Sequence, residues 1–304
     1  MIDSTIGWIG VGAMGYPMAK RLLDHGYTVY VLDRPSKKTQ EILREGAKAV
    51  FNVLEMAKHA SCIFSMIPKA EVLLDAAGQI AACGAERKTE AVIDMSTLSP
   101  IDSLHAAEIL AQAQVAFLRA PVTGSTSYAA AGTLGIMASG PRALFDEAMP
   151  LLRILGNRQS YLGETEQARY YKLAINMLLG NIMQAFSESL VFGEKAGLDY
   201  ATLIDLIADS AAAAPMIRYK AENLKRRDFS PMSVAFNTDK DMGLALEVAE
   251  QCAAVLPMST FTRQMFVSMR TRGLSDADMC ALLLLNEQMS GISTGELEKL
   301  QKKI

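Results

Sequence analysis

Three glycines and an aspartate near the N-terminus have the spacing of a phosphate-binding loop. Gly10, Gly12 and Gly15 form a G-x-G-x-x-G motif, and Asp33 follows further along the chain. In this motif the first glycine permits a tight turn, the second lets a pyrophosphate approach the backbone, and the third lets a helix pack closely on a strand. Free amide groups at the helix start attract phosphate, and Asp33 can accept hydrogen bonds from an adenosine ribose. These residues therefore predict a dinucleotide site.

The elements around these glycines come in the order that such a site needs. Thr5–Ile9 is short, apolar and β-branched, which predicts a buried strand, and Met14–Leu23 has helical apolar spacing. Thr28–Leu32 predicts a second strand, which Asp33 closes. Glycine clusters also make ordinary turns, but the complete order of strand, glycines, helix, strand and acid favours dinucleotide binding.

Two further groups of side chains could act on a substrate. Thr123, Gly124 and Ser125 place two hydroxyls around a glycine and could bind a small carboxylate. Lys172 and Asn176 are four residues apart in a predicted helix, so they project from one face. Taken alone, such a pair is more often a surface charge beside a polar neighbour than a catalytic pair.

Strands and helices alternate through the first half of the chain. After the first three elements we expect strands at Cys62–Ile67, Ala91–Met95, Ala116–Leu118, Leu134–Ala138 and Gln159–Leu162, and helices at Lys37–Glu45, Val53–His59, Pro100–Gln112 and Arg142–Leu155. This alternation predicts an α/β, Rossmann-type doubly wound sheet, mostly parallel, over residues 1–163.

Only helical patterns follow after about residue 163. We expect helices at Thr165–Gly197, Tyr200–Ser210, Pro215–Leu224, Asp239–Gln251, Ser259–Met269 and Asp276–Leu285, and a solvated last turn at Glu296–Lys303. The first is unusually long and could join the two parts of the chain. Residues 164–304 therefore predict an all-helical C-terminal domain.

Ligands of such sheets bind at the carboxyl ends of the strands. Besides the glycine motif, three predicted strands end in candidate loops: Met66-Ile67-Pro68, Asp94-Met95-Ser96-Thr97, and Arg119 to Ser125. A proline that ends a strand, or Ser99-Pro100 starting a helix, needs no ligand to explain it.

Composition and charge exclude several classes of protein. The chain has 304 residues, of which 50% are hydrophobic and 21% charged, so it can bury a core. A net charge of −3 argues against a nucleic acid partner. The basic run Lys225–Arg227 fits a solvated helix end.

No apolar run is long enough for a membrane span and no basic leader precedes the first strand, so we expect a cytoplasmic protein.

Cysteines and histidines show no metal-binding spacing. The four cysteines, Cys62, Cys83, Cys252 and Cys280, lack C-x-x-C spacing and fit buried thiols in a reducing compartment. The histidines His25, His59 and His105 fall in predicted helices or at their ends, outside any motif. We therefore expect no metal site.

Motifs in the same order along most of the chain resemble those of the β-hydroxyacid dehydrogenase family. This family includes 3-hydroxyisobutyrate dehydrogenase, tartronate semialdehyde reductase, succinic semialdehyde/glyoxylate reductase and, more distantly, 6-phosphogluconate dehydrogenase. The matching stretches are Gly7 to Ala19, Asp94-Met95-Ser96-Thr97, Ala120-Pro121-Val122-Thr123-Gly124, Gly132-Thr133-Leu134, Lys172-Leu173-x-x-Asn176 and Lys240-Asp241-Met242.

The resemblance implies roles for individual positions. Lys172 matches the catalytic lysine and Asn176 the asparagine that holds the substrate, while Lys240 matches a lysine that reaches over the cofactor. The positions expected to bind substrate are Ser96, Thr123, Gly124, Ser125, Lys172 and Asn176. Those expected to bind cofactor are Gly10, Val11, Gly12, Ala13, Met14, Gly15, Asp33, Arg34, Met66, Ile67, Pro68, Thr97 and Lys240.

The implied reaction is hydride transfer between NAD(P) and a small 3-hydroxy acid or its semialdehyde. The lysine would protonate the alkoxide that hydride delivery creates, or accept a proton in the reverse direction. Asp33 favours NAD because its charge repels a 2′-phosphate, whereas Arg34 could instead bind that phosphate of NADP. The resemblance also implies a small carboxylate substrate and assembly as a homodimer or homotetramer.

Departures from the family pattern concern the substrate loop. Arg119 stands where the family usually has an acid, Thr123 replaces a serine and Ser125 a glycine. Two alternatives stay open. An imine reductase has a related fold but usually lacks the lysine at position 172, and a non-catalytic dinucleotide-binding module would bind cofactor without turnover.

Overall fold

The computed structural model describes residues 2–303 and divides into two compact units, Met1–Lys172 and Leu173–Ile304. The division falls inside one continuous helix, α8 (Gln167–Lys195). The predicted Rossmann-type unit followed by a helical unit, with a long helix joining them, is confirmed. The predicted domain boundary after residue 163 stays a prediction.

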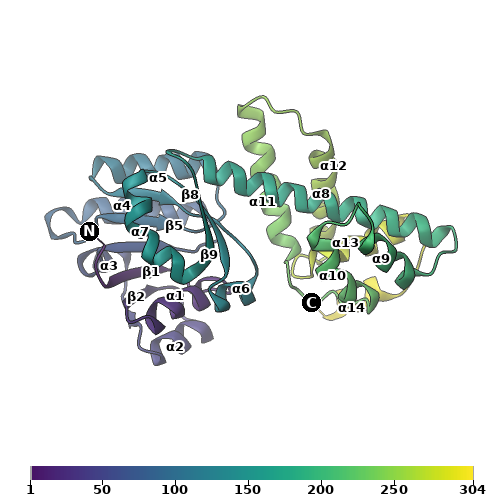
Figure 1. The fold of residues 1–304 in the computed structure, drawn as a ribbon, viewed down its shortest axis with the longest axis horizontal. Coiled ribbons are helices and arrows are strands. Elements are labelled where there is room, and N and C mark those ends of the chain that lie inside the picture. The colour runs from purple at the N-terminus through teal and green to yellow at the C-terminus, as the bar shows by residue number, and fades with distance from the viewer. Residues whose placement is uncertain (1, 304) are drawn as a thin grey trace. The chain divides into compact units, whose positions relative to one another are not determined.

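The first unit is built on a nine-stranded sheet with the order β3-β2-β1-β4-β5-β6-β8-β7, and β9 pairs with β8 (Figure 1). Its strands are β1 Thr5–Ile9, β2 Thr28–Leu32, β3 Lys48–Ala49, β4 Cys62–Ser65, β5 Ala91–Asp94, β6 Ala116–Arg119, β7 Val122–Thr123, β8 Leu134–Ser139 and β9 Gly156–Gly163. Strands β1 to β6 pair in parallel, whereas β8 is antiparallel to β6 and β7. Because β1, β2, β4, β5 and β6 run the same way, the loops after them lie at one edge of the sheet.

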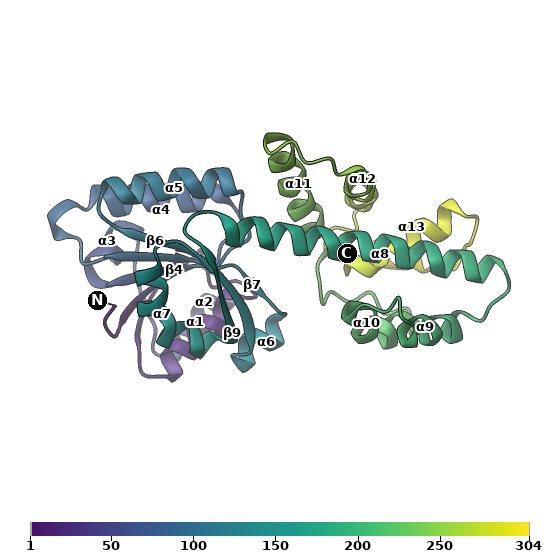
Figure 2. The same ribbon diagram turned by 45° about the horizontal axis from the view of Figure 1, so that its top comes forward.

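Helices cover both faces of this sheet. They are α1 Gly15–Asp24, α2 Lys37–Arg44, α3 Val53–His59, α4 Ala70–Ala82, α5 Pro100–Gln112, α6 Thr126–Ala131 and α7 Arg142–Leu155, with a 3-10 turn at Gly84–Glu86. Figure 2 shows α4 and α5 along one face of the sheet and α1 and α7 along the other. A doubly wound sheet follows from this arrangement.

Successive side chains of β1 point to opposite faces of the sheet, and helices bury both faces. Ile6 and Trp8 pack with α1, α2 and α7, whereas Ile9 packs with α3, α4 and α5. The bare face of Gly7 lies against Met56, since a Cβ there would be 2.6 Å from its sulfur. A strand buried on both faces reads as a continuous apolar run, as Thr5–Ile9 does.

Over residues 173–303 the second unit contains helices, one isolated bridge and a 3-10 turn, and no regular strand. After α8 come α9 Tyr200–Asp209, α10 Pro215–Lys225, α11 Ala235–Gln251, α12 Pro257–Thr271, η2 Met279–Ala281, α13 Leu282–Met289 and α14 Glu296–Lys303. Helices α9 and α10 lie side by side, as do α11 and α12 (Figures 1 and 2). Their apolar faces, with those of α8 and α13, enclose one core. None of the helices in residues 2–303 is long and apolar enough to cross a membrane.

Several elements form where no helix or strand is predicted. Residues 68–90 carry no predicted element, yet α4 forms there because Leu73, Ala76, Ala77 and Ile80 make one buried face. The short elements β3, β7 and α6 are also missed. The helix expected from Asp276 is wrong at its start: Asp278 caps the 3-10 turn, and the regular helix begins only at Leu282.

Two expectations about exposure are wrong. Cys62, Cys83 and Cys280 are buried, but Cys252 is exposed because it caps the C-terminal end of α11. Arg227, expected in a solvated helix end, is half-buried and donates to Glu287 at 2.5 Å. Its guanidinium also lies over the ring of Tyr200. The positive φ of 52° at Arg227 turns the chain inward after α10.

Candidate active site

The loop at residues 10–15 joins β1 to α1 and has the backbone that its glycines predict. Gly10 has φ +91°, and a Cβ there would be 2.4 Å from the Met66 carbonyl oxygen. A Cβ on Gly15 would be 1.9 Å from the Gly10 carbonyl oxygen. Gly10 therefore makes the turn, and Gly15 permits the close packing of α1 on the loop.

A dinucleotide fits this loop. Apart from Gly12 itself and its two chain neighbours, no described residue has an atom within 4 Å of a Cβ built on Gly12, so that side of the loop is open. Within residues 2–303, no side chain caps the first turn of α1, which follows Met14. Its amide groups can bind phosphate. Beneath the loop, the buried Trp8 indole donates a 3.0 Å hydrogen bond to the Gly10 carbonyl and holds the turn in place.

Asp33 and Arg34 follow β2 at the same edge of the sheet. One Asp33 oxygen accepts from the Val11 backbone N–H at 2.7 Å, and the other accepts from the Arg34 N–H at 2.6 Å. The carboxylate thus supports the glycine loop. Arg34 is exposed, so its guanidinium has room to meet a phosphate.

The loops after β4 and β5 are tied to each other. The Ile67 backbone N–H donates to the Ser96 hydroxyl at 2.9 Å, and that hydroxyl donates to Asp94 at 2.8 Å. The structure therefore brings together three groups of positions that are expected to bind the cofactor. They are the glycine loop, Met66 with Ile67, and the residues beside Ser96. Ser96 is 1% exposed and its proton is already donated, so it can offer a ligand only an acceptor lone pair.

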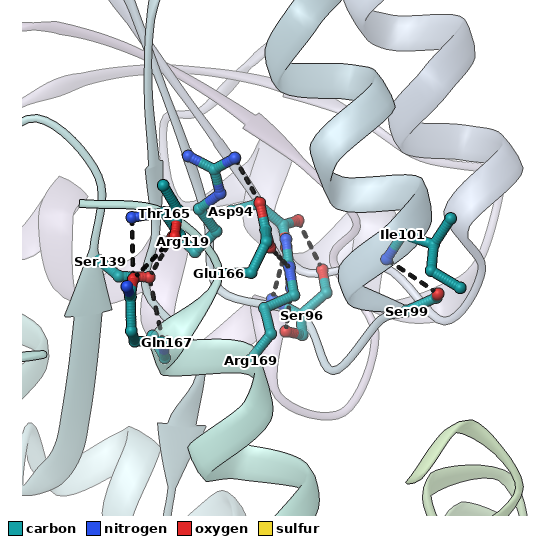
Figure 3. A network of polar contacts seen from close by, with 11 residues as sticks. Asp94, Ser96, Ser99, Ile101, Arg119, Ser139, Thr165, Glu166, Gln167 and Arg169 are labelled. Carbon is teal, nitrogen blue, oxygen red and sulfur yellow. Dashed lines mark hydrogen bonds and ion pairs between the residues drawn. The ribbon is translucent and has the colours of Figure 1, made fainter. Parts of the chain in front are cut away.

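Behind this edge lies a group of buried charged side chains whose contacts with one another are not predicted from the sequence (Figure 3). Asp94 accepts from Ser65 at 2.5 Å and from Arg169 at 2.7 Å, and Arg169 also donates to the Ser96 carbonyl at 2.9 Å. Arg119 forms an ion pair with Glu166. Burial lowers the pKa of the Arg119 guanidinium, and Glu166 opposes that shift. The sequence feature that indicates this group is Arg119, a charged residue at the end of an apolar strand. A charge buried there needs a partner of opposite sign.

The candidate carboxylate loop lies around the short strand β7. Thr123 is exposed and pairs with Gly135 of β8, and Gly124 has φ +128°. Ser125 is the N-cap residue of α6 but makes no capping bond with its side chain; its hydroxyl lies 2.7 Å from that of Ser127. The hydroxyl and amide donors expected here are thus on a turn that only glycine adopts easily.

Lys172 is the last residue of the first unit, and Asn176 and Lys240 belong to the second. Lys172 is half-buried in α8, one turn after Arg169. In the second unit, Asn176 donates to Asp241 at 2.5 Å, and the Lys240 ammonium lies 3.0 Å from the other Asp241 oxygen. Asp241, 5% exposed, thus joins two expected site residues and was itself not predicted as one.

Comparison with known proteins identifies the family. Residues 5–163 match the model of the NAD-binding domain of 6-phosphogluconate dehydrogenase, and residues 167–285 match the NAD-binding domain of NADP-dependent 3-hydroxyisobutyrate dehydrogenase. The chain belongs to the β-hydroxyacid dehydrogenase family. It is thus an oxidoreductase of this family, with a nicotinamide-dinucleotide-binding domain.

Relatives within the family match over nearly the whole length. The chain is 35% identical to 2-(hydroxymethyl)glutarate dehydrogenase of Eubacterium barkeri, over 95% of this chain and 96% of that protein. It is 33% identical to glyoxylate/succinic semialdehyde reductase 1 of Arabidopsis thaliana, over 91% and 96%. The structure of Mycobacterium tuberculosis 3-hydroxyisobutyrate dehydrogenase with L-serine has the same fold, with a TM-score of 0.86, 24% identity and coverage of 94% and 99%.

Proposed function

We propose that this family member transfers a hydride reversibly between NAD(P) and a small 3-hydroxy acid or its semialdehyde, with Lys172 as the general acid and base. One observation carries the proposal. Arg169 bonds to the Ser96 carbonyl at the carboxyl end of β5, and Lys172 follows one helical turn later in the same unit. This bond supports a position for the lysine near the edge at which the glycine loop lies.

The names of the relatives support the substrate class. 2-(Hydroxymethyl)glutarate carries a primary alcohol near a carboxylate, and glyoxylate and succinic semialdehyde are short acids with an aldehyde. Such a substrate needs an anion-binding group and a proton donor. The chain offers Thr123, Gly124 and Ser125 for the first need and Lys172 for the second.

Each residue has a separate task in the proposed reaction. The nicotinamide, when bound, supplies or accepts the hydride. The Lys172 ammonium donates a proton to the developing alkoxide, which is worth about 10²–10⁴ in rate. Asn176 and Lys240 contribute polar groups that Asp241 orients. The substrate carboxylate binds the hydroxyl and amide donors of the Thr123 turn, which sets the distance from carboxylate to carbonyl carbon.

Two finer points belong to this proposal. We expect NAD to be preferred, because Asp33 stands at the position of the motif that meets the adenosine ribose, and its charge would repel a 2′-phosphate. We also expect a homodimer or homotetramer, which analytical ultracentrifugation tests.

The test combines a substrate screen with one substitution. NAD(P)H absorbance is followed with short hydroxy acids, and in reverse with semialdehydes. Lys172→Ala should lower kcat by about 10²–10⁴ while calorimetry shows an unchanged Kd for the cofactor. Lys195→Ala, an exposed lysine later in α8, is the matched control and should have no effect.

Two outcomes would contradict the proposal. Unchanged turnover in Lys172→Ala would remove the role assigned to that lysine. Tight cofactor binding without turnover of any hydroxy acid or semialdehyde would indicate a binding module, and turnover of cyclic imines instead would indicate an imine reductase.

A further inference from the structure

Four charged side chains are nearly completely buried at one place in the first unit. Asp94 is 0% exposed, Arg119 5%, Glu166 7% and Arg169 1%. They come from the ends of β5 and β6 and from the segment that begins α8 (Figure 3). The set contains two acids and two arginines, so its charges balance.

Arg169 connects the two segments that the proposed reaction needs. Its guanidinium donates to Asp94 at 2.7 Å and to the Ser96 carbonyl at 2.9 Å. Thr97, the next residue after Ser96, is expected to contact the cofactor, and Lys172 lies three residues after Arg169. One side chain thus spans from a cofactor loop to the turn that carries the proposed proton donor.

Glu166 holds the same turn from a second direction. It forms the ion pair with Arg119 at the end of β6, and its other oxygen lies 3.7 Å from the Arg169 Nε. Its carbonyl accepts the N–H groups of Arg169 and Tyr170, the first bonds of α8. Ser139 adds a third anchor, because its hydroxyl donates to the Thr165 carbonyl at 2.6 Å.

A buried charge cluster is a costly way to stabilise a fold. Desolvation cancels most of the attraction, and apolar side chains of similar volume often stabilise a protein as well or better. Guanidinium groups with fixed donor directions instead define geometry, because the bonds form at only one relative placement of the segments. The cluster therefore fits a positioning role better than a purely stabilising one.

We propose that Arg119, Glu166 and Arg169 are positioning residues that fix the first turn of α8, and with it Lys172, against the ends of β5 and β6. This proposal rests on the proposed function, because the group that these residues would position is Lys172. These residues need not touch substrate or cofactor. Their effect appears in kcat, since displacement of a reacting group by about 1 Å can cost on the order of 100-fold in rate.

The experiment separates positioning from stability. Arg119→Met and Glu166→Gln are made singly and together, with Tm, kcat, KM and cofactor Kd measured for each. Each single variant leaves the buried cluster with one uncompensated charge and should lower both Tm and kcat. The double variant is balanced again, so its Tm should recover, while kcat stays roughly 10- to 100-fold below wild type. Recovery of kcat together with Tm would overturn the positioning role.

A charge-conserving variant keeps the test usable if a single variant does not fold. Arg169→Lys retains the cation, but an ammonium lacks the planar donor pair that reaches Asp94 and Ser96 together. We expect a loss in kcat with unchanged cofactor Kd, and wild-type kcat would contradict the proposal. Arg142→Met, which breaks the exposed pair with Asp146, is the control and should leave kcat unchanged.

Lys172→Ala, measured in parallel, distinguishes the two proposals. Full turnover without the lysine would overturn the proposed function and the positioning role with it. If Lys172→Ala loses turnover while the double variant and Arg169→Lys keep wild-type kcat, only the positioning role is overturned.

Discussion

The side-chain amide of Asn176 donates a 2.5 Å hydrogen bond to the carboxylate of Asp241. An ionised carboxylate only accepts hydrogen bonds, so the NH₂ end of the amide must face Asp241. Asn176 therefore presents its carbonyl oxygen to other neighbours. Such an acceptor suits the hydroxyl of a 3-hydroxy acid and would repel a carboxylate.

Asp241→Asn tests this orientation. Without the charge, the amide of Asn176 can bond in either direction, and Lys240 loses its 3.0 Å ion-pair partner. We expect kcat/KM to fall roughly 5- to 10-fold, the effect of about 1 kcal/mol. Steady-state kinetics with the best hydroxy acid measures this. Glu250→Gln, an exposed acid on the same helix, should change nothing, and an equal effect there would point to general electrostatics instead.

Asp33 combines support of the glycine loop with discrimination between cofactors, and two substitutions separate these tasks. Asp33→Asn keeps an oxygen for the Val11 N–H but removes the negative charge. The KM for NADPH should therefore fall about fivefold, the effect of about 1 kcal/mol near the surface. Asp33→Ala also removes the acceptor and should weaken NADH and NADPH alike. A wild-type protein that already prefers NADPH strongly would show that Arg34 outweighs Asp33.

Gly12 and Gly15 should respond differently to alanine. A Cβ at Gly12 meets open space among the described residues, so Gly12→Ala should keep Tm within about 2 °C yet weaken cofactor binding at least about tenfold. Gly15→Ala would place its Cβ 1.9 Å from the Gly10 carbonyl oxygen and should lower Tm as well. Thermal unfolding and calorimetry on both variants decide this. Unchanged affinity in Gly12→Ala would place the pyrophosphate elsewhere.

Cys252 should be the thiol that alkylates first. Burial raises the pKa of the Cys62 and Cys280 thiols, so at pH 8 both stay protonated and shielded, whereas the thiolate is the reactive form. Cys252 is exposed, so an alkylating reagent can reach its sulfur without any unfolding. Iodoacetamide followed by peptide mass spectrometry should find one modified site before any unfolding. Modification of Cys62 at a similar rate would contradict the packing of β4.

The fold of the first unit was largely predictable because its strands are short apolar runs between helical patterns. Gly10, Gly12, Gly15 and Asp33 lie within one βαβ unit, so sequence order alone assembled their loop. Helix α4 was not predicted because two of its four buried residues are alanines, whose apolar signal is weak. The prediction that a helix begins at Asp276 was wrong because the side-chain cap at Asp278, rather than apolar spacing, determines where the helical segment begins.

The contacts within the buried charge cluster could not be predicted from sequence order. Asp94, Arg119, Glu166 and Arg169 become neighbours only because β5 and β6 are adjacent and α8 starts near their ends. Likewise Asp241 bonds to Asn176 across 65 positions of sequence. Pairing of this kind requires the packed structure, since many acids and bases of the chain are chemically equivalent before folding.

The chain has one tryptophan, and its indole lies directly beneath the turn that should receive the pyrophosphate. Trp8 also stacks on Phe64 with ring centroids 5.5 Å apart, so its surroundings are rigid. Its ultraviolet emission is therefore a built-in optical probe of nucleotide occupancy. Quenching and energy transfer to a reduced nicotinamide would report binding even in variants that have lost all turnover.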